Sequence, residues 1–290
     1  MRIFAIDGNS LLNRAFFGVM PLNAPDGTPT NAVYGFINIL NKLREEHAPD
    51  FFCVAQDTRP PTFRHTMYEN YKAGRRPMPD ELAAQLPLYN EYLDLCGIPR
   101  YAEAGYEADD LLGAIGRLYK RAGHECVIVT GDRDAFQLVS AGVSVLHVST
   151  RMGRTETKLY GEAEVFERYG ITPPQLVDMK ALMGDQSDNI PGVAGVGEKT
   201  AGDLMRRFGS LDAIYENLGE LTESLRSKLL NGREAAYMSR ELARIDVNAP
   251  VELAEPREPR GLTEFYRRLG FKKFLAAVEA SPPLEQLSFF

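Results

Sequence analysis

Short apolar runs alternate with longer segments of helical period in the first half of the chain. The runs have strand length and are rich in β-branched and aromatic residues, and they lie at Arg2 to Ile6, Phe51 to Ala55, Cys126 to Thr130 and Val143 to His147. Between them, residues 31–46, 80–95 and 109–121 repeat apolar positions every three or four residues, which predicts helices with one buried face. This alternation predicts an α/β fold, with a mostly parallel central sheet flanked by helices.

The second half has a different pattern. From about Val165 the strand signals stop, and short helical segments follow one another between glycines and prolines. We therefore expect three parts: an α/β core at 1–164, a helical region at 165–280 and a tail at 281–290.

Composition narrows the possible environments and partners. The longest apolar stretches are far shorter than the roughly 20 residues that cross a bilayer, and the chain starts directly in a strand pattern, so we expect a cytoplasmic protein without a membrane contact. The net charge of −7 speaks against a nucleic-acid partner. If many of the acids surround bound cations, the net charge no longer argues against such a partner.

Acidic residues follow the predicted strands at the positions where ligands bind in an open parallel sheet. These acids, together with three that open the helix at 109–121 and two from the helical region, are Asp7, Asp57, Glu107, Asp109, Asp110, Asp132, Asp134, Asp185 and Asp188. So many like charges at one sheet edge are tolerable when divalent cations lie between them. Carboxylate oxygens without clustered histidine or cysteine favour magnesium or manganese over zinc.

Such a site predicts phosphodiester hydrolysis, because two metal ions about 4 Å apart can activate water and stabilise the leaving oxygen. Two alternatives stay open. Each acid, taken alone, is also typical of an ordinary turn or a helix start. Transfer through an aspartyl-phosphate is a second chemistry, but it usually needs another Asp two residues after the first, where this chain has Asn9.

A basic and aromatic segment, residues 63–88, follows the second predicted strand closely and is expected to overhang the acids. Its side chains suited to a single nucleic-acid strand are Phe63, Arg64, Tyr71, Lys72, Arg75 and Arg76. A solvated charged loop is the alternative.

A glycine-rich loop leads into a helix at about 190–208. Gly195, Gly197 and Lys199 allow close approach of a phosphate to backbone N–H groups at a helix start. A dinucleotide fingerprint is excluded by the order of the glycines and by the lack of a preceding strand. A plain turn between helices remains the alternative.

Taken in order, Ile6–Ser10, Tyr71-Lys72, Tyr106–Asp110, Thr130–Asp134 and Gly184–Gly197 resemble the 5′-nuclease domain of bacterial DNA polymerase I, a group within the flap-endonuclease superfamily. The resemblance implies a PIN-like nuclease fold, with the nine acids as ligands of two or more Mg²⁺ or Mn²⁺ ions and with residues 63–88 as a helical arch. In this arch Lys72 and Arg75 act at the scissile phosphate.

The same resemblance implies that Arg14 lies near substrate phosphates and that the glycine loop is a helix-hairpin-helix element. This element would hold duplex DNA with a potassium ion, bound by the carbonyls of Val193 and Val196. The implied activity is 5′-3′ exonuclease and flap endonuclease cleavage of branched or gapped DNA and removal of RNA primers, by a monomer associated with the bacterial nucleoid. A module that binds branched DNA without cutting is the alternative.

The last residues form a separate pattern. Gln286, Leu287, Phe289 and Phe290 resemble the short peptide with which bacterial proteins bind the sliding clamp. Docking of these apolar residues on their own domain is the alternative. The sequence does not decide between a free-standing nuclease and a fragment of a polymerase, nor which acid binds which ion, nor the balance of exonuclease and endonuclease activity.

Overall fold

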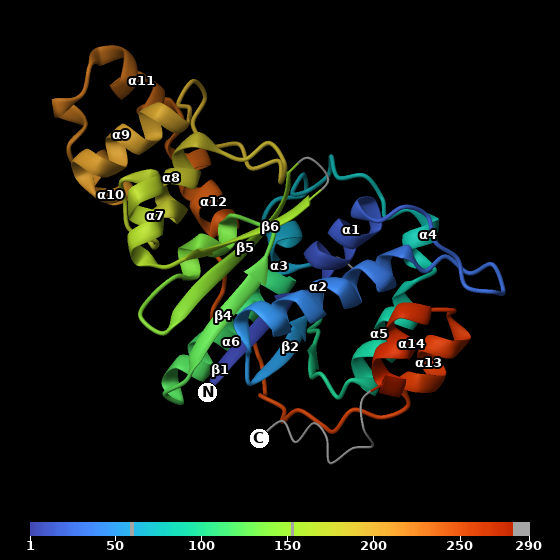
Figure 1. The fold of residues 1–290 in the computed structure, drawn as a ribbon. Helices are drawn as coiled ribbons and strands as arrows, with labels where there is room; N and C mark the ends of the chain where they lie inside the picture. Colours follow the sequence, from blue (N-terminus) through green and yellow to red (C-terminus); the bar gives the residue numbers. More distant parts are fainter. Residues whose placement is uncertain (59–60, 152–153, 281–290) are drawn as a thin grey trace.

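A six-stranded sheet forms the centre of the molecule (Figure 1). The computed structural model describes residues 1–58, 61–151 and 154–280. In chain order the strands are β1 (Arg2–Asp7), β2 (Phe51–Ala55), β3 (Arg100–Tyr101), β4 (Glu125–Thr130), β5 (Val143–Arg151) and β6 (Arg154–Tyr160). Their order across the sheet is β3-β2-β1-β4-β5-β6, and every pair is parallel except β5 with β6. The predicted α/β fold with a mostly parallel sheet is confirmed.

Two strands were not predicted from the sequence. β3 is only two residues long. β6 lies at the edge of the sheet, and its sequence RTETKLY is largely polar, with Tyr160 buried but Glu156 and Lys158 exposed. An edge strand that faces solvent gives little of the apolar signal by which the other strands are recognised.

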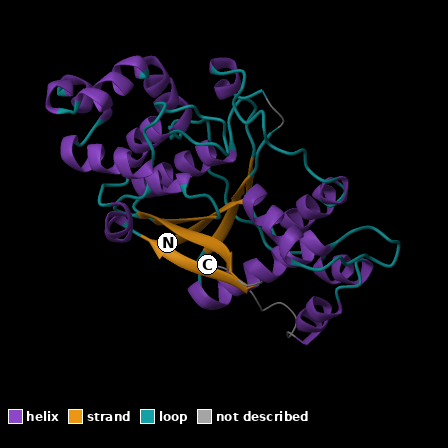
Figure 2. Ribbon diagram, turned by 90° about the horizontal axis from the view of Figure 1, so that it is seen from above, coloured by secondary structure: helices purple, strands orange, loops and turns teal. Residues whose placement is uncertain are grey.

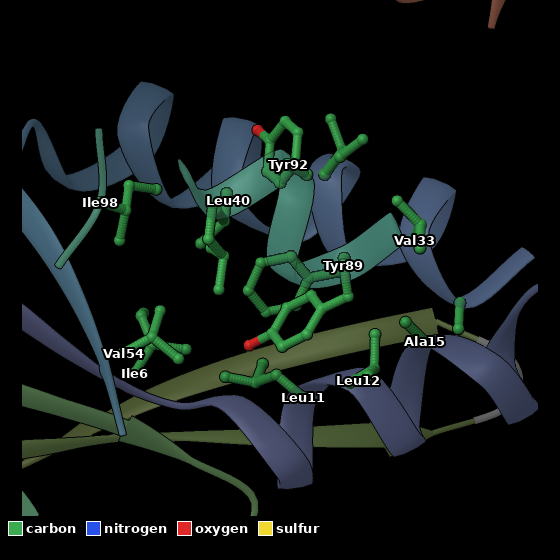
Figure 3. Packing of buried hydrophobic residues seen from close by; sticks show 14 of the residues in the cluster. Ile6, Leu11, Leu12, Ala15, Val33, Leu40, Val54, Tyr89, Tyr92 and Ile98 are labelled. Carbon is green, nitrogen blue, oxygen red and sulfur yellow. The ribbon is translucent and has the colours of Figure 1, made fainter. Parts of the chain in front are cut away.

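One face of the sheet is covered by α1 (Gly8–Gly18), α2 (Asn31–His47) and α5 (Leu86–Leu95), with α13 (Leu262–Arg268) and α14 (Lys272–Ala280) beside them. Figure 3 shows Leu11, Leu12 and Tyr89 packed between these helices and the strand residues Ile6 and Val54. A Cβ atom on Gly8 would lie 2.6 Å from the Tyr89 hydroxyl and 3.0 Å from the Ala55 carbonyl. This close approach explains why glycine follows Asp7.

The other face is covered by α6 (Ala108–Arg121) and by the 3₁₀ helix η1 (Asp134–Leu138). Between β2 and α5 lie two short helices, α3 (Phe63–Met67) and α4 (Asp80–Ala83). The single helix predicted at 80–95 is therefore wrong, because it divides into α4 and α5. The break lies just before Pro87, which lacks the N–H that would continue the hydrogen-bond ladder.

The helical region packs around its own core, which includes Leu182, Val193, Met205 and Ile214. Its elements are α7 (Glu162–Tyr169), α8 (Gln175–Met183), α9 (Glu198–Phe208), α10 (Leu211–Glu216), η2 (Leu218–Glu220), α11 (Glu223–Asn231) and α12 (Arg233–Ala243). Figure 2 shows these helices gathered beside the strands. None of the helices in the described part of the chain is both long and apolar enough to cross a membrane. The predicted tail at 281–290 lies outside the described residues.

Candidate active site

A cleft of about 980 Å³ opens at the carboxyl ends of β1, β2 and β4. Ligands bind at this edge of open parallel sheets because loops and helix starts converge there. The predicted acids that line the cleft are Asp7, Asp57, Glu107, Asp109, Asp132, Asp134 and Asp185. The two remaining predicted acids, Asp110 and Asp188, do not line it.

Asp7 and Asp109 are the acids whose environment is least favourable for a lone negative charge. Asp7 ends β1 and accepts hydrogen bonds from the Thr130 hydroxyl at 2.6 Å and from the Ser10 N–H at 2.9 Å. Burial nevertheless raises its pKa to about 6. Burial, followed by the charge of Asp7, raises the pKa of Asp109 well above its usual value. Asp109 Oδ1 is buried and has no hydrogen-bond partner among the described residues.

Asp57 and Asp132 complete the central group. Asp57 Oδ1 accepts a hydrogen bond from the Ala108 N–H at 2.8 Å, which ties the end of β2 to the start of α6. Asp132 Oδ1 accepts one from the Asp134 N–H at 2.9 Å. In the part of the chain that the structure describes, no three acidic, histidine or cysteine side chains converge closely enough to form a ready-made metal site.

Lys180 on α8 brings a positive charge into the cleft that sequence reasoning missed. Its ammonium group is buried and pairs with both Asp134 and Asp185. Burial raises the pKa of Asp134 to about 6 even with this lysine nearby. Burial also opposes ionisation of Asp185, but Lys180 and Ser187 lower the pKa of Asp185 to about 2. The only signal in the sequence was a lysine within the apolar run Met179–Leu182, five residues before Asp185.

Arg64 corrects the prediction of a DNA contact at this position. Its side chain is 2% exposed and uses all five N–H groups inside the protein. Two carboxylates, Glu107 and Asp110, and the carbonyls of Leu242 and Arg244 accept these hydrogen bonds at 2.7–3.1 Å. A residue held in this way joins α3 to α6 and to the end of α12, and in the structure it has no N–H group left to donate to a nucleic-acid strand.

Asp110 has a structural role in this arrangement. It is fully buried, and its two oxygens accept from Arg64 and from the N–H groups of Glu107 and Asp246. These bonds occupy the lone pairs that a metal ion would need. An arginine thus neutralises this carboxylate in the structure, and the expectation that Asp110 is a metal ligand stays a prediction.

The arch residues Lys72 and Arg75 lie at the cleft, as the sequence predicts, but each is paired with an acid. Lys72 Nζ is 2.7 Å from Glu107 Oε1, and Arg75 Nη2 is 2.5 Å from Asp188 Oδ1. Tyr71 is 3% exposed and donates its hydroxyl to Glu107 at 3.0 Å, so its ring is covered by protein in the structure; stacking on a base stays a prediction.

The remaining predicted DNA-binding residues of the core occupy three different settings. Arg14 on α1 is half-buried and lines the cleft. Phe63 is half-buried between the Arg64 guanidinium, 4.5 Å from its ring centre, and the Tyr106 ring. Arg76 is exposed and lies outside the cleft lining.

The glycine loop joins α8 to α9 through residues 184–197. Gly195 and Gly197, the residue that precedes α9, are exposed, as is Lys199 in the first turn of that helix. The side chains of Val193 and Val196 are buried, and the Val196 N–H donates to the Val193 carbonyl at 3.0 Å. A Cβ atom on Gly192, whose φ is +62°, would overlap the backbone of Gly184, so only glycine allows the two ends of the loop to pack together.

Comparison with known families agrees with this geometry. Residues 2–170 match the family described as 5′-3′ exonuclease, N-terminal resolvase-like domain, and residues 171–260 match 5′-3′ exonuclease, C-terminal SAM fold. The chain is 45% identical to DNA polymerase I of Caldicellulosiruptor bescii over 87% of its own length and 30% of that protein. It is 41% identical to DNA polymerase I of Bacillus caldotenax over 99% of its own length and 34% of that protein. The chain thus spans about a third of these relatives.

Solved structures show the same fold. T5 5′-exonuclease with bound zinc ions superposes with a TM-score of 0.68 at 22% identity, over 85% of this chain and 90% of that one. The catalytic core of Rad2 in complex with DNA substrate superposes with a TM-score of 0.60 at 19% identity, over 92% of this chain and 87% of that one. The chain belongs to the 5′-3′ exonuclease family, as its resemblance to the nuclease domain of bacterial DNA polymerase I predicts.

Proposed function

We propose that the protein is a metal-dependent, structure-specific 5′ nuclease, which hydrolyses DNA phosphodiesters as a 5′-3′ exonuclease and flap endonuclease. One observation carries this proposal above the others. Asp109 places a buried, unpartnered carboxylate oxygen beside Asp7, Asp57 and Asp132, in a cleft at the carboxyl ends of parallel strands. Such a group needs a cation, and oxygen donors favour Mg²⁺ or Mn²⁺.

The residues that would hold two or more ions are the four carboxylates of the central group, with Asp134 and Asp185 beside them. When bound, the ions would lower the pKa of a water molecule and neutralise charge on the leaving oxygen. The chain's own contribution is to fix these acids on rigid elements. The Thr130 hydroxyl orients Asp7, and the Ala108 N–H orients Asp57. T5 5′-exonuclease is a relative of the same fold with divalent metal ions bound.

The arch supplies positive charge to the strand that is cut. Lys72 and Arg75 carry charges that are balanced by Glu107 and Asp188 while no substrate is present. A substrate phosphate over the cleft would compete for both side chains, which would then neutralise its charge in the transition state. Phe63, Arg76 and Arg14 are the further side chains that we assign to the strand.

The glycine loop before α9 is the surface that we assign to duplex DNA, as a helix-hairpin-helix element. Gly195, Gly197 and Lys199 present backbone N–H groups and a positive charge at the start of a helix, which favours a phosphate. The carbonyls of Val193 and Val196 would bind a potassium ion there.

These relatives support a proposal for the biological setting. Removal of flaps and RNA primers in DNA replication and repair, by a monomer in the cytoplasm near the nucleoid, fits a nuclease related to DNA polymerase I. For the tail we propose that Gln286, Leu287, Phe289 and Phe290 bind a sliding clamp. Deletion of residues 286–290 should then abolish clamp binding and leave cleavage unchanged, and unchanged clamp binding would dismiss this assignment.

A cleavage assay with product mapping tests the function. A duplex with a labelled 5′ flap is incubated with the protein and MgCl₂ or MnCl₂, and the products are sized at single-nucleotide resolution. Cuts near the base of the flap that disappear with EDTA support the proposal. A flap that is bound but left uncut across titrations of both metals would instead show a module that recognises branched DNA without cutting it.

A further inference from the structure

The cleft has a second basic side that lies away from the arch. Arg133, His147 and Arg14 line it, together with Ser149 and Asn13. His147 on β5 contacts the Gly131 carbonyl through Nε2 at 3.1 Å. An added Cβ atom on Gly131 would overlap the Arg14 guanidinium. The histidine and this arginine therefore both lie next to one glycine, directly before Asp132.

A third arginine continues this surface beyond the cleft. The Arg168 guanidinium lies 3.3 Å from the Tyr160 hydroxyl, and the Tyr160 ring lies 6.3 Å from the His147 ring. The pKa of His147 is lowered, first by burial and then by the charges of Arg133, Arg14 and Arg168, although its bond to the Gly131 carbonyl acts in the opposite direction. Three arginines, Arg133 after β4, Arg14 on α1 and Arg168 on α7, thus place positive charge around His147.

This side differs from the arch in how its charge is balanced. Lys72 and Arg75 are each within 2.7 Å of a carboxylate. Within the described part of the chain, neither Arg133 nor His147 forms an ion pair. Arg133 is also exposed, so it is available to a ligand without giving up a partner. The charge of Arg133, which no acid balances within the described residues, favours a polyanion in this part of the cleft.

The order of the strands indicates which part of a substrate reaches this surface. Asp57 follows β2, Asp7 ends β1, Asp132 follows β4, and His147 lies on β5, in the order of neighbours across the sheet. Three strand spacings separate β2 from β5, which is about 14 Å. A strand that passes from the arch over the carboxylates would therefore leave the cleft over β5.

We propose that Arg133 and His147, with Arg14, form a second phosphate-binding surface that holds the backbone of the DNA on the side of the scissile bond away from the arch. This proposal rests on the proposed function, because it takes the position of the scissile phosphate from the carboxylates. It adds two side chains, Arg133 and His147, to the substrate-binding set. Their contact is with sugar-phosphate backbone, so they contribute affinity and positioning without base specificity.

The test compares binding of two nicked duplexes, one with a 5′ single-stranded flap and one without, by fluorescence anisotropy with CaCl₂ in place of MgCl₂. The variants are Arg133→Gln, His147→Gln and the double variant. Arg121→Gln is the matched control, because it removes an exposed arginine at the far end of α6. Arg75→Gln represents the arch. Thermal unfolding of each variant confirms that it is folded.

We expect the double variant to weaken binding of both duplexes by the same factor, about tenfold or more. Arg133→Gln should also reduce the slope of log Kd against log salt concentration by about 0.9, the value for one lost phosphate contact. Arg75→Gln should weaken only the duplex with the flap.

Two results would overturn the inference: binding by the double variant equal to that of Arg121→Gln, or a loss that disappears when the flap is removed. Failure of the proposed function is a separate result, namely no cleavage of the flap by the wild-type protein in MgCl₂ or MnCl₂.

Discussion

The predicted acids fall into two regions, which differ in how buried negative charge is neutralised. Beneath the arch, Glu107, Asp110 and Asp188 are neutralised by Arg64, Lys72 and Arg75. In the centre of the cleft, no cationic side chain among the described residues forms an ion pair with Asp7 or Asp109, and burial raises the pKa of both. The first region is complete without a ligand. The second region is balanced only when protons or cations are added.

Asp134 and Asp185 lie between these two extremes. Lys180 contacts both, yet the pKa of Asp134 stays raised at about 6. One lysine therefore offsets only part of the cost of burying this carboxylate. The comparison teaches that acids which look equivalent in the sequence differ in environment: some are paired with basic side chains inside the protein, and others are buried without such a partner among the described residues.

The largest expected effect tests the neutralised region. Asp110→Ala leaves the Arg64 guanidinium buried without its bidentate partner, which should cost about 3–5 kcal/mol of unfolding free energy. Urea denaturation measures this loss. Asp94→Ala is the control, because it breaks an exposed pair with Arg100 and should cost about 1 kcal/mol or less. Equal losses in the two variants would contradict a structural role for Asp110.

The next effect tests the acids in the centre of the cleft. Asp109→Asn should reduce flap cleavage at least about 100-fold, because even the loss of an outer partner of a metal ligand costs about 10–100-fold. Thermal stability in EDTA should not fall, since the substitution removes an unbalanced buried charge. Asp94→Asn serves as the control for cleavage. Activity of Asp109→Asn within twofold of the wild type would exclude a role in catalysis.

Lys180 lies between the two regions, and its removal tests how far one cation offsets the charge of two acids. Lys180→Met removes the cation that would compete with a metal ion for Asp134 and Asp185. A neighbouring positive charge lowers the pKa of a carboxylate by about one to three units. Without this charge, the two carboxylates attract cations more strongly, so Mg²⁺ should bind Lys180→Met about tenfold more tightly than the wild type. The concentration of MgCl₂ at which thermal stabilisation is half-maximal reports this change. A higher requirement for MgCl₂ would show that Lys180 helps to build the ion site.

The smallest effect is a dependence of stability on pH. Because the pKa of Asp7 is raised to about 6, folding favours its protonated form. That contribution is complete below the unfolded pKa near 4 and is lost as pH rises through about 6. In EDTA, the melting temperature should therefore fall by a few degrees more between pH 5 and pH 7 in the wild type than in Asp7→Asn, at about 2–4 °C per kcal/mol. The same pH dependence in both proteins would contradict a raised pKa at Asp7.

The sequence predicts the sheet and the meeting of the acids because both depend on short-range patterns. Four strands were recognisable from apolar runs, and acids placed directly after strands necessarily share one edge. The partners of buried charges could not be predicted in this way. Arg64 meets Asp110 across 46 positions of the chain and the Leu242 carbonyl across 178 positions, and nothing local distinguishes it from the exposed Arg76. Likewise, His147 looked like any other strand residue until β5 was placed beside β4.

Binding of Mn²⁺ to the DNA-free protein, measured by isothermal titration calorimetry at pH 7.5 on the wild type and on Asp109→Asn, tests the central claim most directly. The account predicts that the wild type binds manganese and that Asp109→Asn, although folded, binds it at least about tenfold more weakly. Equal affinity and stoichiometry in the two proteins would contradict the claim that the open carboxylates of the cleft are the site for metal ions.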